Sequence, residues 1–448
     1  MKNILNLIRL NGRFFCDILC IMKTRTTTKP ILKKLPNGLR IVLVPMPGNN
    51  TVTVLTLVAA GSKYETRQQS GLSHFLEHMC FKGTTKRPTA MDITYELDSL
   101  GAQANAFTGQ EYTGYYAKSD VKHFHQVLDI VADVYQNSTF PEPEIEKEKG
   151  VIIEEINMYA DMPDEIASEN LEKLMYGDTP AGRSIAGDIG TVKKMSRKDF
   201  VNYHRKFYTA ENTVIVVSGG IDEKIIPIIK QSFAGVVKKT KNKKPKTSDK
   251  QSERGIMIHK KSTQQTHLAI GFRGYDMYHS DEVTASVLAS VLGSGMSSRL
   301  FQKLREEMGV CYYVYANHQS TSDTGVFKIG AGVTNARTAE VVGVLLDECR
   351  RLTTELVPAA ELQKVRDMIR GRMTLGLESS NSWAMYYGGQ VVHDKPLQTI
   401  DEQLKKLEKI TPQNLQKIAK KIFTEKRMNI SIVGPSVKQG EIEELFKM

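Results

Sequence analysis

The chain of 448 residues is too long for one ordinary hydrophobic core, so we expect two to four domains. Hydrophobic residues make up 40% and charged residues 25% of the sequence, as in globular proteins, and no run approaches the roughly 18 apolar residues that span a bilayer. The five cysteines are few, odd in number and scattered, which favours free thiols in a reducing compartment over a disulfide framework.

The net charge of +11 suggests a nucleic-acid-binding protein until the charges are located. Residues 1–34 carry a net charge of +7 and residues 238–250 a net charge of +6, which leaves the rest of the chain at −2. The basic residues therefore belong to a tail and a linker, both of which we interpret as solvated charge runs. We expect no nucleic-acid partner.

Residues 1–30 form a basic N-terminal extension that we expect to be disordered. Its acid-poor composition is also that of an organelle presequence, while Met22 offers a second start that would exclude residues 1–21 from the native protein. We favour the second explanation and hence a cytoplasmic protein. A mitochondrial-matrix location follows if the extension acts as a presequence.

From Leu35 onward the sequence has the patterns of an α/β layer. Apolar, β-branched runs predict strands over residues 39–45, 52–58, 104–108, 112–118 and 212–218. Helical periodicity predicts helices over residues 71–83, 90–100, 120–137, 142–160, 164–176 and 196–208. This order of elements predicts a mixed sheet with helices packed on one face.

The helix expected between Ser70, as N-cap, and Gly83, as stop signal, carries the motif His74-x-x-Glu77-His78. Histidines at positions i and i+4 project from one face and can bind one zinc ion, and a nearby carboxylate can act on a metal-bound water. H-x-x-E-H is the inverted form of the H-E-x-x-H zinc-protease motif. The alternative is that these three side chains are simply solvated.

Catalytic zinc takes three protein ligands and leaves one position for water, so a third ligand is needed. The acidic helix from Glu142 to Glu155 is the best source, because Glu148 and Glu155 lie seven residues apart, two turns along one face. Spacing alone does not choose among Glu148, Glu154 and Glu155, and glutamate-rich helices are commonly just exposed.

A Lys-rich segment without apolar residues to bury predicts a linker over residues 238–254. Beyond it, the helix, aromatic-Thr and strand pattern of residues 195–219 recurs at an offset of 215 in residues 410–434. We therefore expect an α+β fold of two homologous domains, residues 31–237 and 255–448. The second domain lacks H-x-x-E-H, so at most one of the two domains binds metal.

Together these motifs resemble the pitrilysin (inverzincin) family of zinc peptidases, most closely the β subunit of mitochondrial processing peptidase and its bacterial relatives. The resemblance runs from about residue 30 to the end of the chain, with further matches at residues 61–65, 105–108, 182–187, 293–305 and 312. It implies one zinc ion per chain, bound by His74, His78 and Glu155, with Glu148 as a supporting carboxylate.

Further roles follow from the resemblance. Glu77 is implied to take the proton of the zinc-activated water and pass it to the leaving amine. Arg305 and Tyr312 resemble the family's Arg/Tyr pair, which orients substrate and helps to stabilise the oxyanion. The residues implied to bind substrate as an added strand are Asn105, Ala106 and Phe107.

In long members of the family the Arg/Tyr pair lies on the last domain of a four-domain chamber, whereas this chain has two such domains. We therefore expect a homodimer, or a heterodimer with a related subunit, in which the pair acts on the partner's zinc. The predicted function is zinc-dependent endoproteolysis of peptides or unstructured protein segments. The alternative is a non-catalytic, peptide-binding chamber subunit, and the presence of all three predicted ligands and the base favours the enzyme.

Overall fold

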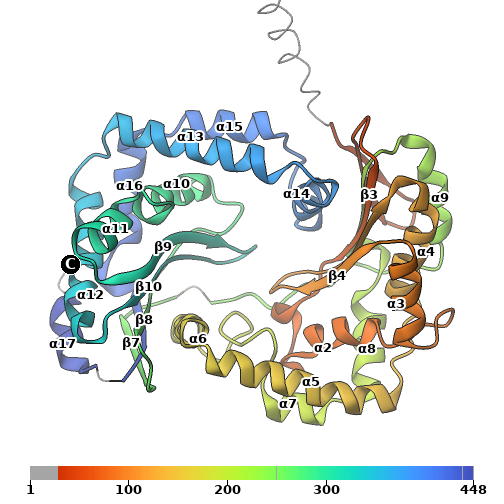
Figure 1. The fold of residues 1–448 in the computed structure, drawn as a ribbon, viewed down its shortest axis with the longest axis horizontal. Coiled ribbons are helices and arrows are strands. Elements are labelled where there is room, and N and C mark those ends of the chain that lie inside the picture. The colour runs from red at the N-terminus through yellow and green to blue at the C-terminus, as the bar shows by residue number, and fades with distance from the viewer. Residues whose placement is uncertain (1–28, 249, 436, 447–448) are drawn as a thin grey trace, which may run out of the picture.

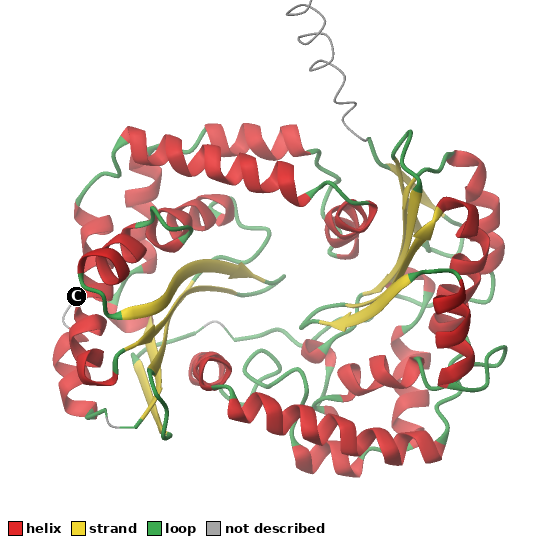
Figure 2. Ribbon diagram, viewed as in Figure 1, coloured by secondary structure: helices red, strands yellow, loops and turns green. Residues whose placement is uncertain are grey.

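The computed structural model of the chain describes residues 29–446, except residues 249 and 436. The extension predicted for residues 1–30 therefore lies outside the described residues, apart from its last two. Figure 1 shows the two halves of the chain facing each other, and Figure 2 shows that each half contains one sheet flanked by helices. None of the helices in this described part combines the length and apolarity that a bilayer crossing requires.

The first half contains a mixed sheet of six strands. β2 runs parallel to β6, and the other neighbouring pairs are antiparallel. In spatial order the strands are β1 (Ile31–Lys34), β2 (Arg40–Pro45), β6 (Thr213–Gly219), β3 (Thr51–Val58), β5 (Thr113–Asp120) and β4 (Gln103–Thr108). All but β1 lie within about two residues of the predicted bounds. The sequence pattern does not predict β1, because most of its side chains are exposed.

Both faces of this sheet are buried. In β2, Ile41 and Leu43 belong to one core, whereas Val42 and Val44 belong to another on the opposite face, as the two-residue period of a strand requires. This explains why the strands read as continuous apolar runs. The helices that complete the core containing Ile41 and Leu43 are α2 (Leu72–Cys80), α3 (Ala90–Ser99), α4 (Phe124–Gln136), α5 (Glu142–Asp161), α7 (Ile189–Lys194), α8 (Arg197–Phe207) and α9 (Ile226–Ser232).

The second half repeats this plan with five strands. Their spatial order is β7 (Gly255–Lys260), β11 (Met428–Gly434), β8 (Thr266–Arg273), β10 (Gly325–Val333) and β9 (Cys311–Ser320). As in the first sheet, one pair is parallel, here the edge strand β7 with β11, and the rest are antiparallel. The accompanying helices are α10 (Glu282–Gly293), α11 (Arg299–Phe301), α12 (Thr338–Thr354), α13 (Ala359–Gly376), α15 (Ile400–Glu408), α16 (Pro412–Ile422) and α17 (Gln439–Glu443).

The two halves are structural repeats. Strands β2, β3 and β6 begin at residues 40, 51 and 213, and β7, β8 and β11 begin at residues 255, 266 and 428, an offset of 215 in each case. The motif helix α2 follows β3, and α10 occupies the same place after β8. The predicted α+β fold of two homologous layers is confirmed.

Each half of the chain contributes one helix that packs against the other half's sheet. α6 (Pro163–Tyr176) packs Leu171 and Met175 against β8 and β11, and α14 (Ser380–Val392) packs against β3 and β6. The approach is close, since a Cβ on Gly388 of α14 would lie 2.7 Å from Leu57 Cδ1. Figure 1 shows both helices on the inner side of the molecule, between the sheets. Each sheet is therefore completed by a helix from the other half of the chain. The domain limits expected from the sequence, residues 31–237 and 255–448, remain predictions.

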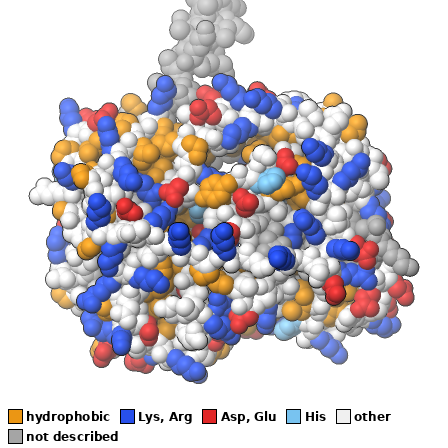
Figure 3. All heavy atoms as spheres, turned by 180° about the vertical axis from the view of Figure 1, so that it is seen from behind, with side chains coloured by type: hydrophobic (Ala, Val, Ile, Leu, Met, Phe, Trp, Pro, Cys, Tyr) orange, Lys and Arg blue, Asp and Glu red, His pale blue; other side chains and the backbone are white. Residues whose placement is uncertain are grey.

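In the Lys-rich segment 238–254, the residues that the structure describes, all but residue 249, form neither helix nor strand. The interpretation of it as a solvated charge run is wrong for Lys244, whose side chain is only 12% exposed and lies 2.5 Å from Asp323 Oδ2 and 3.2 Å from Glu111 Oε1. The reason is that the fold buries two carboxylates beside the linker, and sequence spacing does not reveal them. Elsewhere Lys and Arg side chains are scattered among acidic and hydrophobic ones on the face seen in Figure 3.

These carboxylates belong to a charge cluster that joins both halves, in which Lys63 and Glu111 are buried and Lys244 and Asp323 are partly exposed. The Lys63 ammonium, which has no exposed surface, donates to Asp323 Oδ1 at 2.5 Å. Glu111 accepts hydrogen bonds from Ser322 N at 2.8 Å and Ser322 Oγ at 2.7 Å. Burial opposes ionisation of Asp323, but hydrogen bonds from Lys244 and Lys63 outweigh it and lower its pKa to about 2.

We expect Lys63→Met to lower the free energy of unfolding by about 3–5 kcal/mol, because it leaves buried carboxylates with too little positive charge. Chemical denaturation measures the change. The control is Lys224→Met, since the Lys224 side chain is 92% exposed and its loss should cost no more than about 0.5 kcal/mol. Equal stability of the two variants would show that the cluster makes no net contribution.

Candidate functional site

The motif helix α2 is held by a buried carboxylate at its N-terminus. The helix begins after Gly71, not after Ser70 as predicted, and Gly71 has a φ of 93°, which only glycine adopts easily. Glu65 replaces a capping side chain, since its carboxylate accepts hydrogen bonds from Gly71 N at 2.9 Å and Ser73 N at 2.6 Å. Burial raises the pKa of Glu65 to about 7, although these hydrogen bonds oppose the rise.

The apolar face of α2 determines which of its side chains remain available. Leu72, Phe75, Leu76 and Met79 are fully buried in the first core. His74, Glu77 and His78 are therefore turned to the opposite, partly open face.

Helix α5 has nearly the predicted bounds and packs against α2. Its buried residues Ile145, Glu148 and Ile152 form one face, and Glu155 continues that face toward the histidines. Glu154, which spacing could not exclude, is instead exposed and accepts a hydrogen bond from Asn157 Nδ2 at 3.5 Å.

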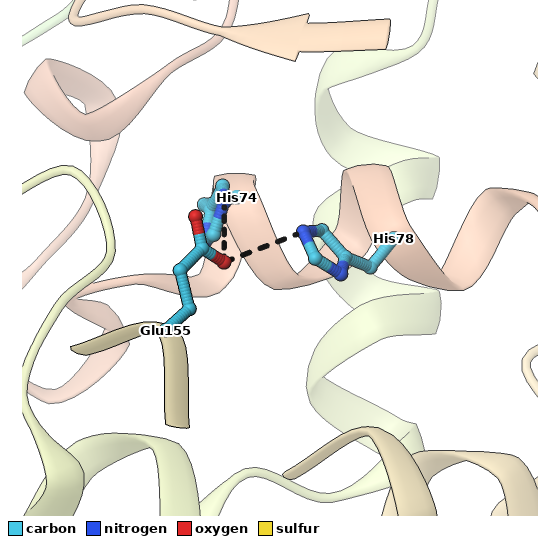
Figure 4. A group of neighbouring side chains, drawn as sticks. All are labelled: His74, His78 and Glu155. Atoms are coloured by element: carbon cyan, nitrogen blue, oxygen red, sulfur yellow. Dashed lines mark ion pairs between the residues drawn. The ribbon is translucent and has the colours of Figure 1, made fainter. Parts of the chain in front are cut away.

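The structure brings His74, His78 and Glu155 together, as Figure 4 shows. Glu155 Oε2 lies 3.6 Å from His74 Nε2 and 3.8 Å from His78 Nε2, and one ligand atom from each residue fits within 4.8 Å of the other two. Ligands at zinc–ligand distances of about 2.0–2.2 Å in tetrahedral geometry lie about 3.3–3.6 Å apart. Two imidazoles and one carboxylate at this spacing fit a three-ligand zinc site with a fourth, open position.

The surroundings prepare the histidines to bind a cation. His78 Nδ1 lies 2.9 Å from Glu148 Oε1, so a proton on Nδ1 leaves Nε2 free to face Glu155. Burial lowers the pKa of His78, but the hydrogen bond to Glu148 and the charge of Glu77 raise it by more. Burial and the neighbouring His78 lower the pKa of His74 to about 4, which keeps His74 neutral.

Glu148 is itself fixed by a second partner. Lys82 Nζ lies 2.6 Å from Glu148 Oε2. Burial raises the pKa of this carboxyl, but the hydrogen bonds from His78 and Lys82 outweigh burial and lower it overall. Glu148 thus remains an anion beside His78, as the predicted supporting role requires.

Glu77 lies on the same face of α2 and contacts the end of strand β4. Its Oε2 accepts a hydrogen bond from Thr108 Oγ1 at 2.5 Å. Burial raises the pKa of Glu77, and the hydrogen bond from Thr108 opposes that rise. A raised pKa makes a carboxylate a better proton acceptor.

Cavities lie on both sides of the site. One of about 430 Å³ is lined by Glu77, His78, Asn105 and Ala106. The other, of about 360 Å³, is lined by His74, Thr108 and Glu155 and by three further carboxylates, Glu165, Glu169 and Glu172. Strand β4 ends the sheet, and within the described part of the chain it pairs only with β5. Its residues that line these cavities bring its outer edge beside the site.

The predicted substrate residues Asn105, Ala106 and Phe107 lie on β4, and their relation to the site differs. Asn105 and Ala106 line the cavity that contains Glu77 and His78. Phe107 instead packs edge-on against Tyr112, with ring centroids 5.9 Å apart, and joins the core beneath α14.

Arg305 and Tyr312 are not brought to the metal residues of the same chain. They lie in the second half, where Arg305 donates to the backbone oxygen of Tyr312 and its guanidinium sits 5.5 Å from the Tyr312 ring centroid. Tyr312 is 70% exposed. Figure 1 shows α11 and β9 in the half opposite to α2 and α5.

Sequence reasoning missed Glu65, Lys82 and the role of Thr108. Glu65 and Thr108 fall within matched segments, but only the fold shows what their side chains touch. Lys82 follows His78 by four residues, which places both side chains on one face of the helix. This spacing is the signal in the sequence that Lys82 lies near the carboxylate that supports His78.

Comparisons with known proteins place the chain among proteins named zinc proteases. Residues 40–189 match the family model described as insulinase (peptidase family M16), and residues 194–369 match the model described as peptidase M16 inactive domain. A Bacillus subtilis protein named uncharacterized zinc protease YmxG is 35% identical over 400 residues, covering 89% of this chain and 97% of its own. A Mycobacterium leprae protein named uncharacterized zinc protease ML0855 is 31% identical over 405 residues, covering 90% of this chain and 91% of its own.

Solved structures share the fold. A protease from Helicobacter pylori has a TM-score of 0.84 at 23% identity and covers 91% of this chain and 100% of its own. A Pseudomonas fluorescens structure described as a peptidase M16 inactive domain has a TM-score of 0.85 at 20% identity and covers 92% of this chain and 99% of its own.

We expect zinc affinity to weaken as the pH falls, because His78 must lose its proton to bind metal and its pKa is raised above 6.5. Below that pKa the dissociation constant should rise about tenfold per pH unit. His74, with a pKa of about 4, stays neutral throughout, so binding should release one imidazole proton. Chelator competition between about pH 5.5 and 8 measures the effect.

Glu148→Gln tests whether Glu148 raises the pKa of His78. The variant should have a lower His78 pKa, so that zinc affinity begins to fall at a lower pH than in the wild type. It should also weaken zinc binding about 10–100-fold at pH 8. An unchanged pH profile in this variant would contradict the assignment of Glu148 as the partner that matters.

Proposed function

Because this chain belongs to the pitrilysin (M16) family of zinc peptidases, we propose that it is a zinc-dependent endopeptidase acting on peptides or unstructured protein segments. The observation that carries the proposal is the convergence of His74, His78 and Glu155. Glu77 lies on α2 together with the two histidines. When bound, zinc supplies an activated water and polarises the scissile carbonyl. We propose one zinc ion per chain.

The residues of the chain perform the remaining steps. The Glu77 carboxylate takes a proton from the attacking water, the new C–O bond forms, and the scissile C–N bond breaks as Glu77 returns the proton to the leaving amine nitrogen. Glu148, by accepting from His78 Nδ1, keeps the other nitrogen of that ring directed toward the metal position. The net reaction consumes one water for each peptide bond broken.

We propose that substrate binds in extended form along the outer edge of β4. The unpaired edge of a terminal strand offers backbone N–H and C=O groups to an added strand, and recognition of this kind accepts many sequences. Asn105 and Ala106 support this placement, since they line the cavity that contains Glu77 and His78.

We further propose that a second chain completes the active site as a homodimer or as a heterodimer with a related subunit. Arg305 and the exposed Tyr312 form a pair in the half of the chain that lacks the metal motif. Their distance from the site of their own chain leaves them available to a partner's site. The cytoplasm remains the compartment we propose, supported by the free state of Cys80, Cys311 and Cys349.

We expect Glu77→Gln to retain zinc and to lower kcat about 10²–10⁴-fold, because the amide cannot accept the water proton. Glu155→Gln should lose zinc as well as activity. Elemental analysis and cleavage of a mixed peptide library measure the two effects. The matched control is Glu154→Gln, an exposed neighbour on the same helix, which should retain both.

A wild-type chain that binds zinc but shows no chelator-sensitive cleavage would contradict the proposal. That result would favour the alternative of a non-catalytic chamber subunit.

Mixing a His74→Ala chain with an Arg305→Ala chain should restore activity that neither has alone. In the mixed dimer, the intact zinc site of one chain receives Arg305 from the other, so random exchange should restore up to about a quarter of wild-type activity. Size-exclusion chromatography with light scattering checks the dimer. A monomeric active enzyme, or no restoration despite exchange, would contradict a shared site.

A further inference from the structure

The side chain of Glu77 is held by one residue outside its own helix. Thr108 Oγ1 donates to Glu77 Oε2 at 2.5 Å, and this is the one hydrogen bond to that carboxylate among residues 29–446 with the two gaps noted above. The other carboxylate oxygen, Oε1, is left for proton transfer. A freely rotating glutamate would spend much of its time away from the reactive geometry.

Thr108 itself has little freedom. It ends β4 opposite Thr113 on β5, and the turn that follows is tied down because Lys63 N donates to Gln110 O at 2.8 Å and Gly109 N donates to Tyr112 O at 2.9 Å. Glu111 of the same turn accepts two hydrogen bonds from Ser322 of the second half. The turn is therefore fixed from both halves of the molecule.

Thr108 also stands where substrate would pass. Asn105 and Ala106 of β4 line the cavity beside Glu77, and Thr108 lines the cavity beside His74 and Glu155. One strand thus crosses the site from one cavity to the other. The hydroxyl that holds the base belongs to the strand on which we place the substrate.

We propose that Thr108 is a positioning residue, whose hydroxyl orients the Glu77 carboxylate toward the attacking water and links that orientation to the substrate-binding strand. The inference rests on the proposed function and deepens it. It assigns to β4 a second task besides binding the peptide backbone. Small errors in the placement of a catalytic group reduce rate without preventing binding.

The test is Thr108→Val, which removes the hydroxyl and keeps the β-branched shape. We expect kcat to fall about 10–100-fold, with KM within about threefold of wild type and an unchanged zinc content. Thr108→Ser retains the hydroxyl and should restore kcat to within about threefold of wild type. The matched control is Thr113→Val, because the Thr113 hydroxyl donates to Ala60 O at 2.9 Å and does not touch Glu77. Thr108→Ala serves if the valine variant does not fold.

A second readout separates positioning from a structural role. In a Glu77→Gln background, Thr108→Val should cause no further loss of kcat/KM, because the hydroxyl acts through Glu77. Binding of a fluorescent peptide to the Glu77→Gln chain should also be unchanged by Thr108→Val.

The outcomes distinguish this inference from the function on which it rests. An inactive wild-type chain overturns the proposed function and the inference together. An active wild type overturns the inference alone in any of three cases: Thr108→Val matches wild type, Thr108→Val loses zinc or affects only KM, or Thr108→Ser fails to restore kcat.

Discussion

Apolar side chains cover both faces of both sheets, and their burial requires helices from both halves of the chain. The inner face of the first sheet is closed by α14, and the equivalent face of the second is closed by α6. Burial of apolar surface on this scale is the main force that holds such layers together. α6 follows α5 after one residue, Met162, so its anchorage on the second sheet also fixes the end of the helix that carries Glu155. The half without a metal motif thereby helps to place a ligand in the half that has one.

The candidate site combines two histidines whose surroundings shift their pKa values in opposite directions. His74 is surrounded by buried groups that disfavour its protonated form, whereas His78 faces the carboxylates of Glu148 and Glu77. The anchoring of Glu148 by Lys82 keeps a negative charge behind His78. A divalent cation would meet three donors whose combined charge and geometry suit it, and it would replace the proton that His78 otherwise attracts.

Much of this arrangement could be predicted from the sequence, and the exceptions have physical reasons. The spacing of His74 and His78 predicts a shared face from helix geometry alone, but Glu155 lies 77 residues after His78, and only the resemblance to a known family selected it. The cap at Gly71 was missed because Glu65 supplies the acceptor from outside the helix. The burial of Lys244 was missed because the carboxylates that attract it come from two hairpins that meet only in the folded chain. Periodicity reports a residue's face within one element, and it carries no information about contacts between elements.

The burial of α10 shows why the two structural repeats are not interchangeable. α10 occupies the position in the second half that α2 occupies in the first, but its residues Ala285, Val287, Leu288, Val291 and Leu292 are all buried. α2 keeps one face partly open for its histidines. At the 215-residue offset of the flanking strands, the motif positions fall on Ala289, Leu292 and Gly293 of α10, which are all buried. Introducing H-x-x-E-H at these positions would therefore place charged and polar groups in a filled core instead of creating a site. Substitution in that helix alone would therefore not give the second half a metal site, and the second half serves the first through the sheet face on which α6 is anchored.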